Sequence, residues 1–434
     1  MIRNLGKPEA YGGEPMQSFV LFVLGFLDLG ATVILPIAIF ILGLFFGQKP
    51  GKAFRSGLTI GVAFVGIFLV VDLLTQNLGP AAQSMVDRLG IELNVIDVGW
   101  PATSSIAWAS VVAAFIIPLG LIVNVVMLVT KTTKTMNVDI WNYWHYTFMA
   151  AVVYTISGSI IQGLIVAVLF QIICLKVADW TAPMVRDFYE MPGVSVATGS
   201  TISYAPGIWL VKWIQKIPGL KNLHADPESI QKHFGVFGDS MVVGLVLGAG
   251  IGALAGYSIG DIIQIGMSMA AVMILMPRMV KILMEGLMPV SESARQWLTK
   301  RFGDREINIG LDAAVLLGHP SVIATALILT PITVFIAVIL PGNAVLPFGD
   351  LATIPFIVAF IVGAARGNLI HSVIAGTIMI ALSLYMATDI APVFTEMATA
   401  AKINVPEDSA MVSSIDQGGN LINWLIWKLF ALFH

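Results

Sequence analysis

Apolar stretches long enough to cross a lipid bilayer, which takes about 20 residues, recur along the whole sequence. Because lipid offers the backbone no hydrogen-bond partners, such stretches are expected to form helices. A transmembrane β-barrel would show short segments of alternating hydrophobicity instead. Charged residues make up 11% of the 434 residues, less than half the share of about 25% that is typical of soluble domains. We therefore predict an all-α polytopic membrane protein and exclude soluble, disordered, nucleic-acid-binding and disulfide-stapled classes.

About ten or eleven membrane elements are expected from the positions of these stretches. They lie at 19–46, 56–74, 102–129, 146–175, 204–215, 236–257, 262–284, 321–340, 351–365, 370–387 and 420–433. Three of them, 204–215, 351–365 and 420–433, are short for a full crossing and contain or border Gly or Pro. We therefore expect some elements to be half-helices or re-entrant hairpins, which are common at transporter sites.

The largest polar interruption divides the chain almost in half. The predicted organisation is a polar N-terminal segment, a first transmembrane half, a cytoplasmic linker and a second transmembrane half, at residues 1–18, 19–216, 217–235 and 236–434. The triplet Phe237-Gly238-Asp239 recurs as Phe348-Gly349-Asp350, and polar turns interrupt apolar sequence in both halves. This pattern fits inverted repeats, as in many transporters, and fits a chance recurrence equally well.

Basic residues gather in a few polar loops, and their placement predicts the orientation. These loops are Lys49–Arg55, Lys131–Lys134, Lys212–Lys232 and Arg278–Arg305. By the positive-inside rule they are cytoplasmic, which puts the N-terminus outside.

The sequence lacks several motifs of catalysis and energy coupling. No Gly-x4-Gly-Lys-Ser/Thr phosphate-binding loop is present, which argues against an ATP-driven pump. The histidines and the single cysteine do not have metal-ligand spacing. Cys174 lies in an apolar run, where an inert thiol is expected. We therefore expect no cofactor and no metal, with function carried by the membrane elements themselves.

Ionisable side chains within apolar sequence are costly and mark candidate functional positions. Asp97, Gly99 and Trp100 lie where the third apolar stretch begins. The carboxylate can accept hydroxyl hydrogen bonds, and the indole face can pack on the C–H groups of a polyol. A helix cap and an interfacial tryptophan are the alternative interpretation.

His145 ends a run of hydrogen-bonding and aromatic side chains that starts at Asp139 and opens the next apolar stretch. It lies one helical turn inward of Trp141 and on the same face, which favours a functional position. An aromatic belt at the cytoplasmic interface is the alternative.

Two short segments combine small, hydroxylated or apolar residues with sequence that cannot form one regular helix. Residues 192–206 predict a re-entrant tip, with an ordinary extramembrane loop as the alternative. Residues 310–321 form a short apolar tract with an acid at one end and Gly-His-Pro at the other, and that acid could simply pair with Arg305. The candidate substrate-binding residues in these segments are Thr198, Gly199, Asp312 and His319.

These motifs together resemble the galactitol-type IIC permeases of the bacterial phosphoenolpyruvate-dependent phosphotransferase system. The resemblance covers nearly the whole chain. The motifs that carry it are Asp97-Val-Gly-Trp-Pro101, Asp139-Ile-Trp-Asn-Tyr-Trp-His145, Phe237-Gly-Asp239, Leu311-Asp-Ala-Ala314 and Gly318-His-Pro320. The resemblance implies a homodimer whose protomers have a substrate-carrying core, a V-shaped scaffold and inverted repeats.

The resemblance also implies roles for single residues. A ligand-binding acid of the related ascorbate permeases lies in a stretch similar to that around Asp312, and Asp97 matches an acid at the entrance to a ligand-binding segment. His145 falls where the ascorbate permeases have a glutamine, and Thr198 where they have a histidine. These differences fit a neutral hexitol, which needs paired donors and acceptors, in place of an anion.

The implied function is transport in the bacterial inner membrane and not catalysis by this chain. The permease binds a polyol such as galactitol outside, carries it by an elevator-like shift and presents it to a separate cytoplasmic IIB protein. IIB carries a phosphocysteine and receives its phosphate from IIA. The competing hypothesis is a proton- or sodium-coupled secondary transporter in which Asp97, Asp239 or Asp312 binds the ion.

Overall fold

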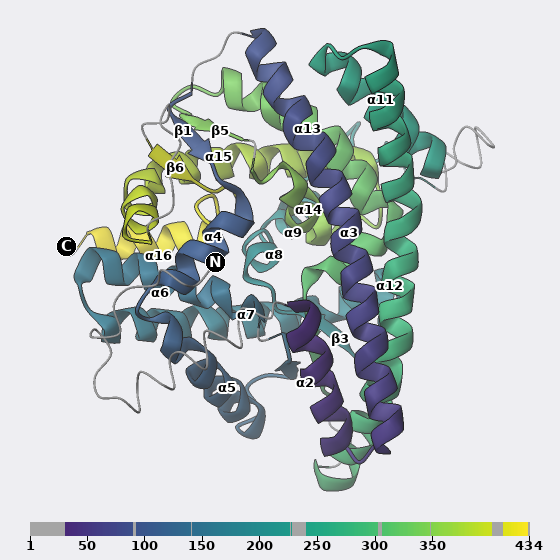
Figure 1. The fold of residues 1–434 in the computed structure, drawn as a ribbon, viewed down its shortest axis with the longest axis vertical. Coiled ribbons are helices and arrows are strands. Elements are labelled where there is room, and N and C mark those ends of the chain that lie inside the picture. Colours follow the sequence, from purple (N-terminus) through teal and green to yellow (C-terminus); the bar gives the residue numbers. More distant parts are fainter. Residues whose placement is uncertain are drawn as a thin grey trace.

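The computed structural model describes residues 31–89, 93–139, 141–225, 227, 240–302, 306–347, 349–401 and 411–432. The described chain is mainly helical, as the sequence predicts, and its elements form two groups (Figure 1). The N-terminal segment, the end of the linker, Phe237–Asp239, Arg305 and Phe348 lie outside the described residues.

The first group consists of four helices that pack along one another. They are α2 (Ala31–Phe45), α3 (Pro50–Leu89), α11 (Ser240–Ala255) and α12 (Ile259–Phe302). Figure 1 shows α3 and α12 running side by side along the long axis of the molecule. With 40 and 44 residues, at about 1.5 Å per residue, each is about twice as long as a bilayer core is thick.

Glycines allow the close packing of these helices. A Cβ atom at Gly248 would come within 2.8 Å of the Ile265 carbonyl of α12, and one at Gly57 within 2.6 Å of the Pro36 carbonyl of α2. Small residues at such crossings let helix backbones approach closely, which is how helices associate when lipid removes the hydrophobic driving force. The four-helix group is therefore a tightly packed layer.

The second group contains the remaining elements, which are shorter and often broken. From the first half of the chain come β1 (Val95–Asp97), α4 (Gly99–Ala109), α5 (Ala113–Val129), β2 (Thr135–Asn137), the 3₁₀ helix η3 (Trp141–Tyr143), α6 (Trp144–Ser157), α7 (Ile160–Phe188), β3 (Val194–Val196), α8 (Gly199–Ser203) and α9 (Gly207–Ile214). From the second half come β4 (Asn308–Leu311), the 3₁₀ helix η5 (Ala313–Gly318), α13 (Pro320–Ile339), β5 (Val345–Leu346), the 3₁₀ helix η6 (Leu351–Thr353), α14 (Ile354–Ala364), α15 (Leu369–Ala400), β6 (Met411–Ser413) and α16 (Leu421–Ala431).

Two small parallel sheets join the two halves of the chain. In the first sheet the central strand β1 comes from the first half, and its neighbours β5 and β6 come from the second. In the second sheet the central strand β4 comes from the second half, and its neighbours β2 and β3 come from the first. Since parallel strands end at the same edge, each sheet brings together the loops that follow three segments distant in sequence.

Several predicted spans are broken in the structure. Among the described residues, four helices are long and apolar enough to cross a membrane: Pro50–Val70, Ile160–Phe188, Pro320–Ile339 and Leu369–Ala400. A fifth span is possible if the pair Ala102–Ala109 and Ala113–Val129 counts as one, although the pair bends by 93°. The apolar stretches predicted at 102–129 and 146–175 are therefore not single straight helices, because the second is also interrupted, at Gly158, which has a φ of 65°. The prediction at 321–340 agrees with α13 to within one residue.

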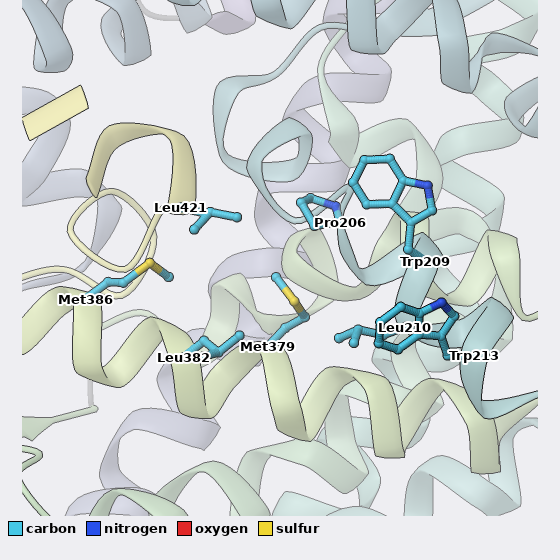
Figure 2. A pocket seen from close by; sticks show the side chains of 8 residues that line it. All are labelled: Pro206, Trp209, Leu210, Trp213, Met379, Leu382, Met386 and Leu421. Carbon is cyan, nitrogen blue, oxygen red and sulfur yellow. The ribbon is translucent and has the colours of Figure 1, made fainter. Parts of the chain in front are cut away.

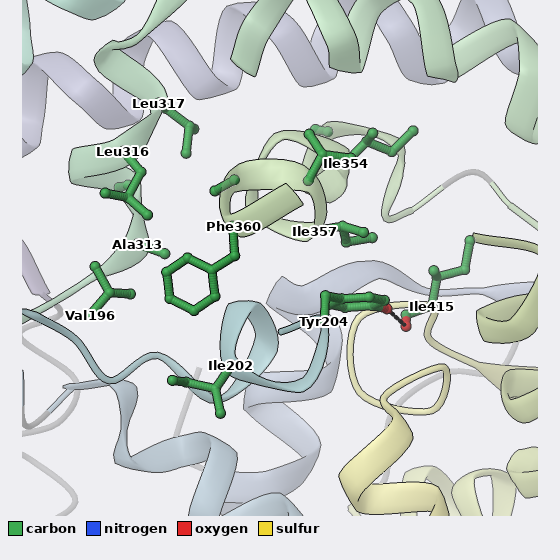
Figure 3. Close-up of a cluster of buried hydrophobic side chains, with 14 of the residues drawn as sticks. Val196, Ile202, Tyr204, Ala313, Leu316, Leu317, Ile354, Ile357, Phe360 and Ile415 are labelled. Carbon is green, nitrogen blue, oxygen red and sulfur yellow. Dashed lines mark hydrogen bonds between the residues drawn. The ribbon is translucent and has the colours of Figure 1, made fainter. Parts of the chain in front are cut away.

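A buried apolar cluster holds the broken segments in place (Figure 3). Phe360 of α14 lies between η5, α8 and β3, and Tyr204 donates a hydrogen bond from its hydroxyl to the Ile415 carbonyl at 3.1 Å. Because protein interiors are close-packed, these contacts fix backbone that has no regular helix or long strand of its own.

Candidate functional site

A small cavity of about 50 Å³ lies where the broken segments of both halves meet. Its lining residues are Phe68, Trp100, Asn142, Trp144, His145, Thr198, Ser200, Asp312, Thr353, Phe356 and Asp416. The lining combines aromatic rings, hydroxyls and carboxylates, and none of these lining residues is Lys or Arg. Four of the eight sequence-predicted site residues, Trp100, His145, Thr198 and Asp312, line this one cavity.

A larger pocket of about 470 Å³ lies between α9, α15 and α16 (Figure 2). It is lined by Pro206, Trp209, Leu210, Trp213, Met379, Leu382, Met386 and Leu421. Apart from the two indole N–H groups, these side chains offer no hydrogen-bond partner to a ligand. The pocket therefore lacks what a polyhydroxylated solute needs, and the small polar cavity is the better candidate site.

Asp312 follows β4 and caps η5. Its Oδ1 accepts the Ala314 N–H at 2.6 Å, and its Oδ2 accepts a hydrogen bond from Asn142 Nδ2. The same Asn142 nitrogen donates to Asp139 Oδ2, so that one amide joins two carboxylates from different halves of the chain. Asp312 is only partly buried, while Asp139 is 2% exposed. The carboxylate that faces the cavity is therefore Asp312.

The segment around Thr198 is buried inside the protein and is not a solvent-exposed loop. The Thr198 hydroxyl oxygen accepts the Ala313 N–H at 2.8 Å, which leaves its own hydrogen to donate. Gly199 is the first residue of α8 and packs against His145, which lines the cavity. A Cβ at Gly199 would lie 2.7 Å from His145 Cβ. Glycine at this position allows the imidazole to pack directly on the α8 backbone.

His145 is 2% exposed and lies in the first turn of α6, so its side chain is buried within the protein. Its ring contacts the Trp144 ring at 3.9 Å between centroids. Nδ1 lies 2.9 Å from Gln417 Nε2, which also donates to Asp416 Oδ2 at 3.0 Å. His145 and Asp416, 271 residues apart in sequence, are thereby joined through one amide at the cavity.

Asp97 lies outside the cavity wall, in a cluster that we call the Asp350 clasp: Asp97, Trp100, Asp350, Thr353 and Ser414. Asp97 accepts the Gly99 N–H at 3.1 Å and the Asp350 N–H at 2.8 Å, while the N-cap position of α4 is Val98. Gly99 has a φ of 75°, and a Cβ there would meet the Gly349 carbonyl oxygen at 2.7 Å.

Asp350 is the centre of this clasp and is fully buried. Its Oδ1 accepts the Trp100 N–H at 2.8 Å and the Thr353 hydroxyl at 3.0 Å. Its Oδ2 accepts the Ser414 hydroxyl at 2.6 Å and the Asp416 N–H at 2.9 Å. Four donors from three loops therefore converge on one carboxylate, which holds the Trp100 and Asp416 backbones in place.

His319 lies away from the cavity lining. It caps α13, where its Nδ1 accepts the Ser321 N–H at 3.2 Å, and its ring stacks on Phe188 at 4.3 Å between centroids. The structure thus separates His319 from the other acid-and-histidine candidates.

Sequence reasoning did not select Asn142, Asp350, Asp416 or Gln417 as site residues. Asp350 belongs to the recurring Phe-Gly-Asp triplet, and this recurrence is the signal that could have identified it. Asp416 and Gln417 stand in a polar Ser-Ser-Ile-Asp-Gln-Gly-Gly-Asn segment ahead of a short apolar stretch, a composition like that of residues 195–203.

Two polar atoms around the cavity remain unpaired. Within the described part of the chain, neither His145 Nε2 nor Asp416 Oδ1 has a hydrogen-bond partner, although Ser200 approaches that carboxylate. Buried polar groups are normally satisfied, so such atoms mark places where a bound molecule completes the hydrogen bonding.

The sequence matches the family profile described as "PTS system sugar-specific permease component" over residues 25–408. It is 44% identical over 406 residues to the "PTS system galactitol-specific EIIC component" of Escherichia coli strain K12, with 93% of this chain and 90% of the relative aligned. The protein of the same name from Escherichia coli O157:H7 matches equally. Such permeases are inner-membrane proteins, consistent with the long apolar helices described above. The chain therefore belongs to the sugar-specific permease components of the phosphotransferase system and is a membrane-embedded transport subunit.

Proposed function

We propose that the chain carries a neutral sugar alcohol, with galactitol as the favoured substrate, for phosphorylation by a separate IIB protein. The observation that carries this proposal is the small cavity with its unpaired His145 Nε2 and Asp416 Oδ1. Hydroxyl groups both donate and accept, so a polyol can satisfy a donor and an acceptor at once. The galactitol-specific name of the similar Escherichia coli proteins supports the choice of hexitol.

The charge of the cavity favours a neutral solute over an anion. Asp312 and Asp416 line it, Asp139 lies behind Asn142, and no Lys or Arg is among the lining residues. An anionic sugar or a sugar phosphate would meet like charge at close range, where repulsion is strong because little water screens it. Phosphorylation by IIB would therefore also expel the product from the site.

The lining residues divide into two roles in this proposal. Trp100 and Trp144 offer ring faces to the C–H groups of the polyol, and Thr198, Asp312 and His145 offer polar atoms to its hydroxyls. Asp97, Gly99 and Gly199 support the backbone beside those side chains, whereas His319 caps α13.

The small volume of the cavity supports a transport cycle that opens and closes the site. Ligand pockets usually measure about 300–1,000 Å³, so a cavity of about 50 Å³ has to expand before a hexitol enters. Phe68 is the lining residue contributed by α3 of the four-helix group. We propose that the second group acts as the transported core, shifts along the four-helix scaffold and thereby moves the site away from Phe68.

The combination of strands from both halves in each small sheet supports an inverted-repeat architecture. Each half contributes the central strand of one sheet and both outer strands of the other. Among the described residues, the first helices of each half form a pair that ends in a very long helix, α2–α3 in the first and α11–α12 in the second. We propose that two halves of equivalent fold form each protomer of a homodimer, with the substrate between their broken segments.

The binding test uses the purified full-length protein in lipid nanodiscs, with galactitol as ligand. We expect galactitol to bind, and galactitol phosphate and ascorbate to compete at least tenfold more weakly. Equal binding of the anions would refute the neutral-site proposal.

The transport test uses sealed vesicles with and without IIA, IIB and a phosphate donor. We expect product to appear as galactitol phosphate and only with the soluble components. Accumulation of unmodified galactitol driven by a proton or sodium gradient would instead establish the secondary transporter.

The orientation test exploits the buried single cysteine. Because Cys174 is inaccessible, cysteines introduced at Lys52 or Lys216 can be labelled selectively. We expect no labelling from outside intact cells, since both positions belong to loops predicted to be cytoplasmic. Strong external labelling would reverse the orientation.

A further inference from the structure

A chain of hydrogen bonds behind the cavity fixes which nitrogen of His145 carries its proton. The chain starts at a backbone carbonyl, which can only accept. The backbone carbonyl oxygen of Gln417 lies 3.1 Å from Asn423 Nδ2. Because this oxygen can only accept, the side-chain atom of Asn423 that faces it must be the donor, which is the amide nitrogen. The same nitrogen lies 3.0 Å from the side-chain atom Gln417 Oε1. Because the nitrogen donates, the Gln417 atom that faces it must be an acceptor, which is the amide oxygen.

The orientation of the Gln417 amide then follows, and it determines which nitrogen of the His145 imidazole carries the proton. Gln417 Nε2 faces two groups, Asp416 Oδ2 at 3.0 Å and His145 Nδ1 at 2.9 Å, and an amide NH₂ has two hydrogens to donate. His145 Nδ1 is consequently an acceptor. In a neutral imidazole the proton must then be on Nε2, the atom that has no partner in the described structure.

We propose that Gln417, held by Asn423, is a positioning residue that keeps His145 in the Nε2–H form, so that the cavity presents a donor beside the Asp416 acceptor. This proposal rests on the proposed polyol function. A hydroxyl group can accept from His145 and donate to Asp416 at the same time. With the proton on Nδ1, the cavity would present two acceptors, and one of them would be left unpaired by a single hydroxyl.

The arrangement is rigid because every member of the chain is buried. Gln417 and Asn423 are fully buried, and Asn423 is itself fixed at the start of α16, where its N–H donates to Asn420 Oδ1 at 3.1 Å. The imidazole cannot turn away, since Trp144 packs on its ring and Gly199 packs against its Cβ.

The first experiment reads the tautomer directly and needs no substrate. Solid-state NMR of the full-length protein with ¹⁵N-labelled histidine is compared with the same spectrum of His145→Asn, which assigns the His145 signals by difference. We expect a protonated Nε2 and an unprotonated Nδ1. In Gln417→Glu, a carboxylate faces Nδ1, and we expect the proton on Nδ1. A protonated Nδ1 in the unmodified protein would overturn the proposal.

The second experiment measures galactitol binding in a double-mutant cycle. Gln417→Met should weaken binding about tenfold when His145 is present, the size expected for one lost hydrogen bond to a fixed donor. The same change should weaken binding less than about twofold in the His145→Leu background, because the residue it positions is gone. Equal losses in both backgrounds would assign Gln417 a merely structural role and overturn the proposal.

Gln171→Met is the matched control. Gln171 is also a buried glutamine, and its Nε2 donates to the Gly120 carbonyl at 2.8 Å, away from the cavity. We expect this variant to bind galactitol as the unmodified protein does. If the unmodified protein binds no polyol at all, the proposed function fails, while the NMR result still decides the tautomer.

Discussion

The Asp350 clasp and the cavity wall contain the same kinds of side chain but use them differently. In the clasp, both oxygens of Asp350 receive two hydrogen bonds each. At the cavity wall, Asp416 Oδ1 and His145 Nε2 make no hydrogen bond within the described chain. Polar residues in apolar sequence therefore serve two purposes here: some satisfy irregular backbone, and others are left for a solute. The number of hydrogen bonds that a polar atom already makes, and not its burial or charge, distinguishes these two uses.

The largest effect should come from breaking the clasp with Asp350→Ala. This change leaves four buried donors without an acceptor, and each costs about 1–3 kcal/mol. That sum is comparable with the whole stability of a typical domain, about 5–15 kcal/mol. We expect the variant to aggregate or to unfold at a much lower temperature, measured by size-exclusion chromatography and thermal unfolding. Asp350→Asn, which retains one acceptor oxygen, should show a smaller loss. An Asp350→Ala protein as stable as the unmodified one would remove the distinction between clasp and cavity wall.

The next largest effect should be on binding, from Asp416→Asn. The substitution keeps the shape and one acceptor, but it removes the charge beside the unpaired oxygen. Loss of a hydrogen bond to a charged group costs about 1.5–3 kcal/mol, so we expect a galactitol dissociation constant about 10- to 100-fold higher. Thermal stability should change little in comparison with Asp350→Ala.

Asp389→Asn is the control for that variant. Asp389 accepts from Lys428 Nζ and from Trp424 Nε1, each at 2.7 Å, and does not line the cavity. Affinity should therefore stay the same. If Asp416→Asn also leaves the affinity unchanged, Asp416 belongs with the clasp and not with the cavity wall.

A smaller loss is expected from Asp312→Asn, because both oxygens of Asp312 already accept a hydrogen bond. An asparagine would also place its amide NH₂ next to the Ala314 N–H or the Asn142 NH₂, and both of these groups are donors. We expect galactitol affinity to fall about tenfold, and to fall equally at pH values on either side of neutrality. Asp179→Asn, which alters a carboxylate bound by Thr133, Lys134 and Thr135 outside the cavity, should have no effect on affinity. Unchanged binding with loss of gradient-driven uptake in Asp312→Asn would support the secondary transporter.

The sequence was sufficient to predict the helical membrane class and four of the eleven residues that line the cavity. Apolar stretches dictate helices, and Asp312 and His145 are conspicuous because ionisable groups rarely stand in such sequence. The breaks within 102–129 and 146–175 are not predicted, although small polar residues stand at both of them, Ser110 and Ser157-Gly158-Ser159. Bends of this kind are set by packing between segments.

The two sheets lay beyond sequence reasoning for a related reason. A strand of two or three residues, such as β5 (Val345–Leu346), has no periodicity to detect, and its partner is 250 residues away. The pairing of His145 with Gln417 depends on this same long-range arrangement. In the sequence alone, Asp416 and Gln417 therefore resemble ordinary turn residues. The fold brings Asp416 to the cavity and Gln417 behind His145.

The smallest effect should come from His319→Asn, the sequence candidate that lies off the cavity. Asparagine can still accept the Ser321 N–H as an N-cap, but the ring contacts with Phe188 and Tyr189 are lost. Aromatic pairs of this kind contribute about 0.5–1.5 kcal/mol beyond their buried area, and we expect a loss of stability of about that size. Galactitol affinity should stay within about twofold, in contrast with the loss in Asp416→Asn. Both quantities can be measured on one sample, by thermal unfolding and by equilibrium binding. A tenfold loss of affinity without a loss of stability would mean that His319 reaches the substrate in another state of the transport cycle. The cavity described here would then be only part of the binding site.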